Sequence, residues 1–145
     1  MMTHSPAYIL SQLLIDLELA TAATDNDDWP IYRNTLPDLP DSCIAIYDRT
    51  PVHHGRCGVN NKVKEHFGVQ IIIRGATQSV AYAKSESIRE ALDETIDKNS
   101  VTILTSTYLV FSTSLRSGPI SLGNEENTAR FLFSINFITA IRQTV

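Results

Sequence analysis

The sequence is short of charge and of cysteine, and it has no long apolar run. Charged residues make up 19% of its 145 residues, where about 25% is usual. Its two cysteines, Cys43 and Cys57, are too few for a disulfide framework. No apolar run approaches the roughly 20 residues that cross a bilayer, and the N-terminus lacks the basic and apolar regions of a secretory signal. These absences predict a protein without membrane-spanning segments, made in the cytosol with free thiols.

Catalytic motifs are missing as well. The sequence has no G-x-S-x-G motif, no glycine-rich phosphate loop and no strand-ending cysteine with a placed histidine. Adjacent carboxylates occur at Asp27-Asp28 and Glu125-Glu126, but their polar neighbours predict solvated surface rather than a general acid or base. We therefore expect a protein that is not an enzyme and that uses no cofactor.

Charge is distributed unevenly along the chain. Residues 1–48 hold eight acids and one base, a net charge of −7, whereas residues 49–145 hold eleven bases and eight acids, a net charge of +3. Such a division suits head-to-tail contact between copies, although a solvated acidic loop accounts for it equally well. The overall net charge of −4 argues against a general binder of nucleic acid or of anionic membranes.

Two segments have the periodicity of amphipathic helices. Apolar residues recur at helical spacing from Ile9 to Leu17, after a cap at Ser5 and a preset first turn at Pro6. A second helix is expected from about Ser79 to Asp97, with Asn99 as a left-handed stop.

Four further segments have the composition of strands. Cys43–Tyr47 is a short apolar run between turn signals, and Phe67–Arg74 is rich in β-branched residues, with an isoleucine on its second face that predicts a central strand buried on both sides. Val101–Thr113 loses its alternation around Thr105–Thr107, which predicts a bulge or a break into two strands. The clearest strand runs from Phe131 to Ile141, where Phe131, Phe133, Ile135, Phe137 and Ile141 recur at period two.

The order of these elements predicts the fold class. Helix, strand, strand, helix and then two or three strands indicate an α+β fold, with a mainly antiparallel mixed β-sheet and two helices packed on one face. The length predicts a single domain over residues 1–145.

Two long irregular segments, at about 20–42 and 49–65, interrupt this pattern. The first is acidic and contains Trp29 as a candidate anchor, and loops of this length in compact domains are usually functional or disordered. The second is expected to be a mobile basic loop or an extended hairpin. Residues 49–64 contain no acid and four bases: Arg49, Arg56, Lys62 and Lys64.

The basic segment also supports two alternatives that the residues leave open. Imidazole and thiolate are good zinc ligands, so His53, His54, Cys57 and His66 form a candidate zinc site, with an exposed polar loop as the competing interpretation. The segment is also the sole candidate for nucleic-acid contact, but it has no aromatic residue for base stacking. Two interpretations of the segment therefore stay open: non-specific contact with DNA or with an acidic protein surface, and a solvated loop without a partner role.

A colinear series of short motifs resembles a known family. The motifs are Leu39-Pro40-Asp41 leading into Ile44–Asp48, then Gly68–Gly75, Tyr82-Ala83 through Ile88 and Leu92, Leu122-Gly123-x-Glu125, and Phe133–Phe137. Together, over roughly residues 39–142, they resemble the tailed-bacteriophage minor capsid and tail-terminator family.

This resemblance implies a structural virion protein. Its subunits would close into a homohexameric ring at the head-proximal end of the tail, halt polymerisation of the tail tube protein and dock to the head–tail connector or neck proteins. It implies assembly in the host cytoplasm, a final location in the virion tail or neck, and non-specific contact with genomic DNA in the lumen. A head-completion, neck or tail tube protein of the same virion is the near alternative, and a small zinc-binding protein is the alternative from a different class.

The charged segments supply the candidate interface residues. We expect the four bases Arg49, Arg56, Lys62 and Lys64 to face the lumen or an adjacent ring. The acidic candidates, which would face a basic neighbour, are Asp25, Asp27 and Asp28, with Trp29 beside them.

Overall fold

The computed structural model of the protein describes residues 3–23, 28–56, 63–95, 99–125 and 128–144, with side chains in these ranges except at 51–56, 63–65, 94, 95 and 112. The elements in chain order are α1 (Pro6–Asp16), β1 (Thr21–Ala22), β2 (Pro30–Arg33), β3 (Cys43–Arg56), β4 (Val63–Gly75), α2 (Gln78–Glu90) with a π-helical turn (Ala91–Thr95), β5 (Asn99–Ile103), β6 (Ser106–Asn124) and β7 (Phe131–Gln143).

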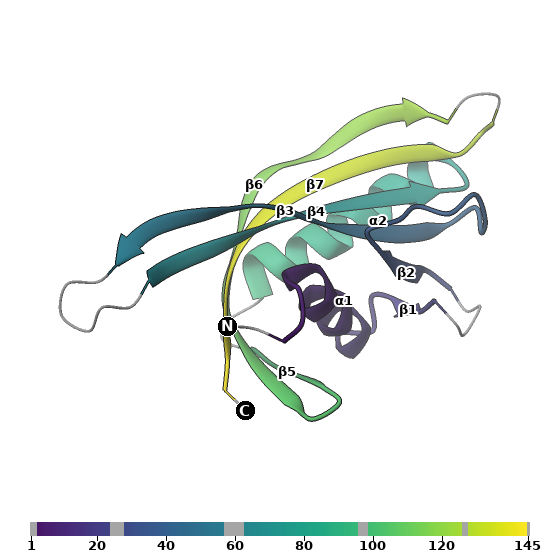
Figure 1. The fold of residues 1–145 in the computed structure, drawn as a ribbon. Helices are drawn as coiled ribbons and strands as arrows, with labels where there is room; N and C mark the ends of the chain where they lie inside the picture. Colours follow the sequence, from purple (N-terminus) through teal and green to yellow (C-terminus); the bar gives the residue numbers. More distant parts are fainter. Residues whose placement is uncertain (1–2, 24–27, 57–62, 96–98, 126–127, 145) are drawn as a thin grey trace.

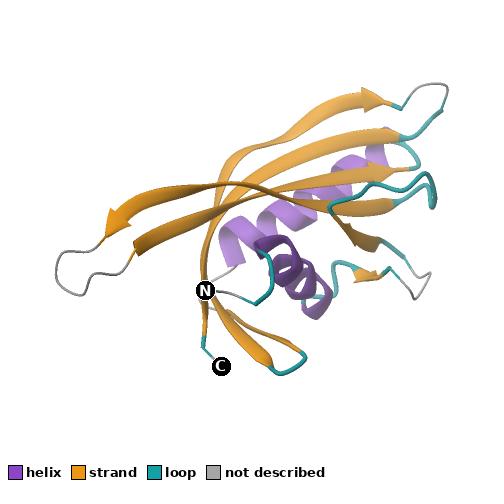
Figure 2. Ribbon diagram, in the orientation of Figure 1, coloured by secondary structure: helices purple, strands orange, loops and turns teal. Residues whose placement is uncertain are grey.

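The described strands form a seven-stranded sheet in the order β1-β2-β3-β4-β7-β6-β5. The β1–β2 and β2–β3 pairs are parallel, and the other pairs are antiparallel. Both helices lie on the same side of this sheet (Figures 1 and 2). The predicted α+β class, with a mainly antiparallel mixed sheet and two helices on one face, is confirmed.

The two helices begin where local sequence signals predict. The Ser5 hydroxyl accepts a hydrogen bond from the Tyr8 N–H at the start of α1, and the Thr77 hydroxyl accepts one from the Val80 N–H at the start of α2. The α-helical part of α2 ends at Glu90, earlier than expected, and continues as a π-helical turn. The predicted left-handed stop at Asn99 is wrong, because this residue opens β5 and pairs with Val110 in an extended ladder.

The core lies between the helices and one face of the sheet. Ile46, Ile71 and Ile135 on three neighbouring strands are fully buried against Leu10 of α1 and Ile88 of α2. Each such burial stabilises the fold by roughly 1.5–3 kcal/mol. The covered face of the sheet is therefore the main source of folding stability.

The opposite face of the sheet carries no helix in the described part of the chain. Ile72 alternates with the buried Ile71 and Ile73 and is only half-buried, as is Gln70. Strand β4 is interior to the sheet as predicted, but the expectation that both of its faces are buried is wrong because this second face has no covering layer.

The acidic segment 20–42 is less irregular than expected. It contains β1 and β2, and Ile31 of β2 is 5% exposed, so it contributes to the core. Ile31 pairs in parallel with Ile44 of β3. This short pairing depends on backbone hydrogen bonds to a strand that follows later in the chain. The local sequence of the segment therefore shows little periodicity.

The described parts of the basic segment, 49–56 and 63–65, pair as an extended hairpin, which is one of the two predicted alternatives. Strands β3 and β4 pair with each other as far as Arg56 and Val63, whereas β4 pairs with β7 only from Phe67 onward. The described parts of this ribbon beyond the sheet, residues 50–56 and 63–66, are called the β3–β4 arm below. Figure 1 shows the arm projecting away from both helices.

The last three strands agree with the predicted break in alternation. Strands β5 and β6 are separated by a turn at Leu104, whose φ of 55° is in the left-handed region. Strand β5 pairs only with Ser106–Val110 of β6, so the rest of β6 is a sheet edge within the described residues. Strand β7 covers the predicted segment and extends to Gln143.

Candidate functional site

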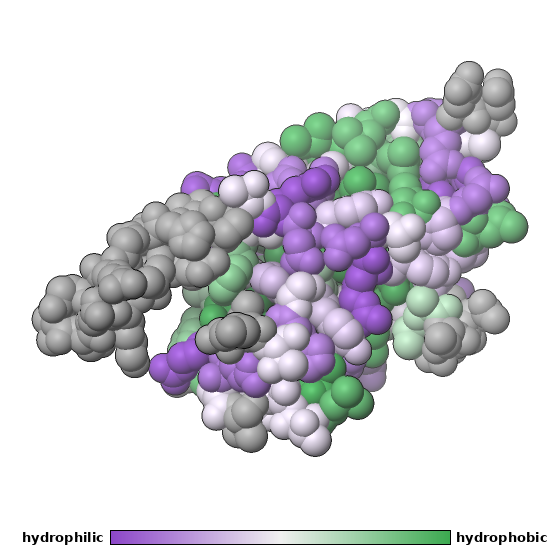
Figure 3. Space-filling view, in the orientation of Figure 1, coloured by the Kyte–Doolittle hydropathy of each residue, from purple (hydrophilic) through white to green (hydrophobic). Residues whose placement is uncertain are grey.

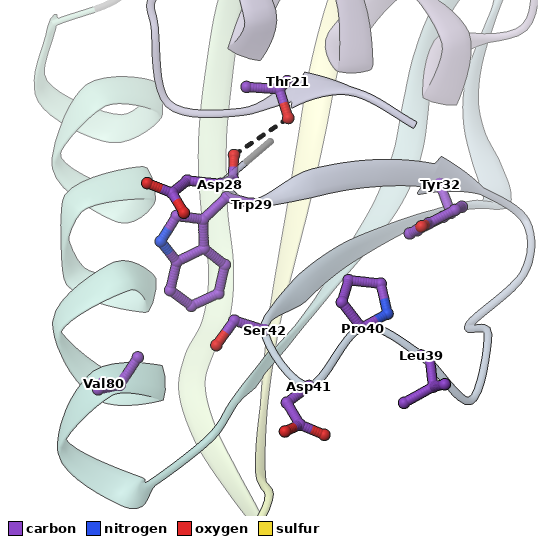
Figure 4. A pocket seen from close by; sticks show the side chains of 9 residues that line it. All are labelled: Thr21, Asp28, Trp29, Tyr32, Leu39, Pro40, Asp41, Ser42 and Val80. Atoms are coloured by element: carbon purple, nitrogen blue, oxygen red, sulfur yellow. Dashed lines mark hydrogen bonds between the residues drawn. The ribbon is translucent and has the colours of Figure 1, made fainter. Parts of the chain in front are cut away.

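A groove of about 1190 Å³ lies between β2, the start of α2 and the segment 34–42 (Figure 4). Two of its aliphatic side chains are strongly exposed, Leu39 by 70% and Val80 by 41%. The lining residues combine aromatic and aliphatic side chains with two carboxylates and two hydroxyls: Thr21, Asp28, Trp29, Tyr32, Leu39, Pro40, Asp41, Ser42 and Val80. The groove thus offers apolar contact and negative charge together.

Trp29 is fixed in the groove by its backbone. Its φ of 57° is unusual for a bulky residue. The Thr21 N–H donates to the Trp29 carbonyl at 3.0 Å, and the Thr21 hydroxyl donates to the Asp28 carbonyl at 3.0 Å. These two hydrogen bonds hold the strained turn and set the direction of the indole.

A cation already lies over the indole. The Lys84 ammonium on α2 is 5.2 Å from the centre of the Trp29 ring, within cation–π range. Burial lowers the pKa of Lys84, and the Asp28 carboxylate partly opposes this shift. The groove therefore combines an aromatic face and a carboxylate, which is the chemistry that binds basic side chains.

The groove wall at 38–41 is held by two arginines, Arg74, which is buried, and Arg130, which is partly exposed. Arg74, at the end of β4, is 1% exposed. Its guanidinium donates to the backbone carbonyls of Pro40 at 2.5 Å and Asp41 at 3.2 Å, and to the Glu125 carboxylate at 3.0 Å. Because each of the three guanidinium nitrogens of Arg74 has an acceptor, its charge is tolerated away from water.

Arg130 completes this arrangement from the start of β7. It forms an ion pair with the same Glu125 carboxylate, and it also contacts the Asp38 carboxylate at 3.3 Å and the Asp41 carboxylate at 3.6 Å. Glu125 thus joins two arginines that both hold the same segment. We call Arg74, Glu125 and Arg130 the arginine clamp.

The clamp corrects one expectation and adds residues that sequence reasoning missed. Glu125 was expected to be solvated, but its side chain is 21% exposed and pairs with both arginines. Arg74 was the available signal, since a charged residue that ends an otherwise apolar strand needs a partner if the strand is interior. Its partner lies 51 residues away, which local spacing does not reveal.

The structure places the predicted interface residues at two separate ends of the sheet. Asp28 and Trp29 line the groove. Arg49 is exposed on β3, where its guanidinium donates to Gln70 and lies 5.5 Å from the Tyr47 ring centre.

The remaining candidate bases belong to the arm or lie outside the described residues. Arg56 ends β3 and Lys64 lies on β4. Asp25, Asp27 and Lys62 fall outside the residues that the structure describes. Among the candidates whose side chains are described, Asp28 and Trp29 at the groove are therefore not brought together with Arg49.

The zinc hypothesis falls mainly on residues that are not described. The side chains of His53 and His54 and the whole of Cys57 lie outside the described set. Among the described side chains, no three His, Cys, Asp or Glu residues are grouped to hold a metal ion. Among the described helices, none is both long and apolar enough to span a membrane.

Comparison with known proteins identifies the family. A family model described as bacteriophage tail terminator protein matches residues 13–143. This range contains the groove, the arginine clamp and the arm. No curated protein matches the chain closely enough to count as a relative. Because the family model covers nearly the whole chain, the protein belongs to the bacteriophage tail terminator family.

Proposed function

We propose that copies of this protein form a closed ring at the head-proximal end of a phage tail. The ring ends polymerisation of the tail tube and joins the tail to the head–tail connector or neck proteins. The observation that carries this proposal is the family match over residues 13–143, which supports a structural role in the tail and a location in the virion.

Ring formation requires two different surfaces on each subunit that fit each other. The groove and the arm supply such a pair, because they lie at opposite ends of β3 and differ in charge. The division of net charge between residues 1–48 and 49–145 provides complementary fields between neighbours.

A terminating ring also needs a surface for the tube and another for the connector. The free edge of β6 is one candidate, since Ile120 and Leu122 on this strand are 46% and 50% exposed. Apolar surface gathers along this part of the molecule (Figure 3). Arg49 lies on the sheet and Arg56 and Lys64 on the arm, and such bases suit non-specific contact with phosphates if they face the lumen.

Electron microscopy of purified protein, alone and mixed with tails, tests the proposal. The expected images show rings with a central hole, bound at one end of each tail. Deletion of the gene should give tails of abnormal length that fail to join heads, and expression of the wild-type gene should restore them. Tails of normal, uniform length after the deletion would contradict termination, and tubes formed by the protein alone would indicate a tube subunit.

A further inference from the structure

We propose that the groove of one copy receives the β3–β4 arm of a second copy, in a head-to-tail contact that repeats from subunit to subunit. This contact rests on the proposed ring and specifies the surfaces that build it. It commits the groove to a basic, partly aliphatic segment of the same protein.

The groove has the chemistry for such an occupant. Asp28 is exposed at its rim, and the Trp29 indole accepts a cation from Lys84 within the same copy. Leu39 and Val80 remain 70% and 41% exposed, so the apolar part of the groove has no cover within the described chain. A segment that carries ammonium or guanidinium groups beside aliphatic side chains would satisfy both features.

The arm has the complementary composition, and its described backbone leaves the sheet as a two-stranded ribbon. Residues 50–66 contain three bases, Arg56, Lys62 and Lys64, against the single acid Glu65, together with three valines. Beyond the sheet, the described residues of β3 and β4 pair only with each other. Because a two-stranded ribbon is marginally stable in water and its like charges repel, it gains from an acidic partner surface.

Geometry requires this contact to join different copies. The groove residue Ser42 immediately precedes β3, and the arm residue Arg56 ends it. The strand between them has a contour of roughly 46 Å at about 3.3 Å per residue. Strand β3 is paired with β4 along this length, so the arm cannot fold back into its own groove. One groove and one arm per copy make a heterologous contact, which closes into a ring when the rotation between copies allows.

Charge reversal on the full-length protein tests the contact. Asp28→Lys changes the groove, and the double change Arg56→Glu with Lys64→Glu changes the arm. Each variant alone should weaken self-association about tenfold or more, measured by sedimentation. Asp16→Lys is the matched control, because it makes the same charge change at an exposed position on α1 outside the groove, and it should leave self-association unchanged.

Mixing the two variants separates lost contact from lost folding. In an equal mixture, each reversed groove meets a reversed arm and each native groove meets a native arm, so association should return to nearly the wild-type level. Failure of the mixture to recover while both variants keep the wild-type circular dichroism spectrum would overturn the proposed contact.

Cross-linking provides an independent measurement. A carbodiimide joins carboxylates to amines in contact, and a mixture of ¹⁴N- and ¹⁵N-labelled protein distinguishes links between copies from links within one. We expect mixed-isotope links from Asp28 or Asp41 to Lys62 or Lys64. Wild-type rings that lack these links and that resist both sets of changes would overturn the contact and leave the ring intact. Wild-type protein that stays monomeric and does not bind tails would overturn the ring and the contact together.

Discussion

The charged side chains at the two ends of the β3–β4 pair differ in the partners they have. At the groove end, Arg74 is 1% exposed and is saturated by two backbone carbonyls and Glu125. At the arm end, residues 50–66 carry three bases and one acid, and the described backbone of the arm pairs only as a two-stranded ribbon. The difference indicates that charge at the groove end serves folding, whereas charge at the arm end is available for a partner.

The largest expected effect is at the arginine clamp. Glu125→Gln removes the carboxylate that joins Arg74 and Arg130, and leaves two guanidinium groups close together. Breaking a largely buried ion pair costs up to about 3–5 kcal/mol, and the remaining acceptors of both arginines reduce this to about 2–4 kcal/mol. Urea denaturation measures the change in the free energy of unfolding.

Glu86→Gln is the control for the clamp, because Glu86 forms a more exposed pair with Arg89 at i,i+3. It should cost less than about 1 kcal/mol. Equal losses in the two variants would show that burial of the clamp contributes no extra stability.

The second effect concerns the contact between the sheet and α2. A Cβ atom at Gly75 would lie 2.5 Å from the Ala81 backbone nitrogen and 2.8 Å from its Cα. Gly75→Ala should therefore push α2 from the sheet and lower the free energy of unfolding by about 1–3 kcal/mol.

Gly68→Ala sharpens the comparison at the base of the arm. Its Cβ would lie 2.8 Å from the Thr50 carbonyl oxygen. Because the described backbone beyond this point pairs only as a two-stranded ribbon, it should shift more easily, and the loss in chemical denaturation should be smaller than for Gly75→Ala. A greater loss at Gly68 would contradict the difference between the two ends.

A third, smaller effect depends on pH. Burial raises the pKa of the Cys43 thiol at the groove end, and Arg74 partly opposes this shift. The unfolded thiol therefore loses its proton at a lower pH than the folded one. The stability gained from burying the protonated thiol is fully present below the pKa of the unfolded state. It is lost as the pH rises through the pKa of the folded state. Cys43→Ala should show less loss of stability between pH 7 and alkaline pH in denaturant titrations, and identical pH profiles would refute this.

The smallest effect on folding is expected from removal of the arm. Replacement of residues 51–66 by Asn-Gly would join Thr50 to Phe67 through a two-residue turn suited to a hairpin. We expect the free energy of unfolding to change by less than about 0.5 kcal/mol, because the described backbone of the arm pairs only within its own ribbon. Self-association should nevertheless be lost. A stability loss of several times this size would show that the arm belongs to the folded body.

Much of the architecture could be predicted because its signals are local. The Ser5-Pro6 cap marks the start of α1, and the period-two recurrence of apolar residues marks β7. The loss of alternation near Thr105 marks the turn between β5 and β6. The short strands β1 and β2 could not be predicted, because their parallel pairing depends on β3 and not on a periodic pattern of their own.

The candidate site was predictable only in part. Asp28 and Trp29 could be selected from their acidic, aromatic surroundings, and both line the groove. Leu39 and Val80 gave no comparable signal, since exposed apolar residues become meaningful only when the fold places them together.

The sequence by itself determined the order of most elements, the separation of acidic and basic halves, and the family to which the protein belongs. Only the tertiary structure decided that Arg74 and Arg130 share Glu125 and that a groove lies behind the segment they hold. The physical reason is the sequence separation over which each kind of interaction acts. Caps and periodicity act within a few residues, whereas a buried ion pair and a groove depend on side chains that the sheet brings together from distant parts of the chain.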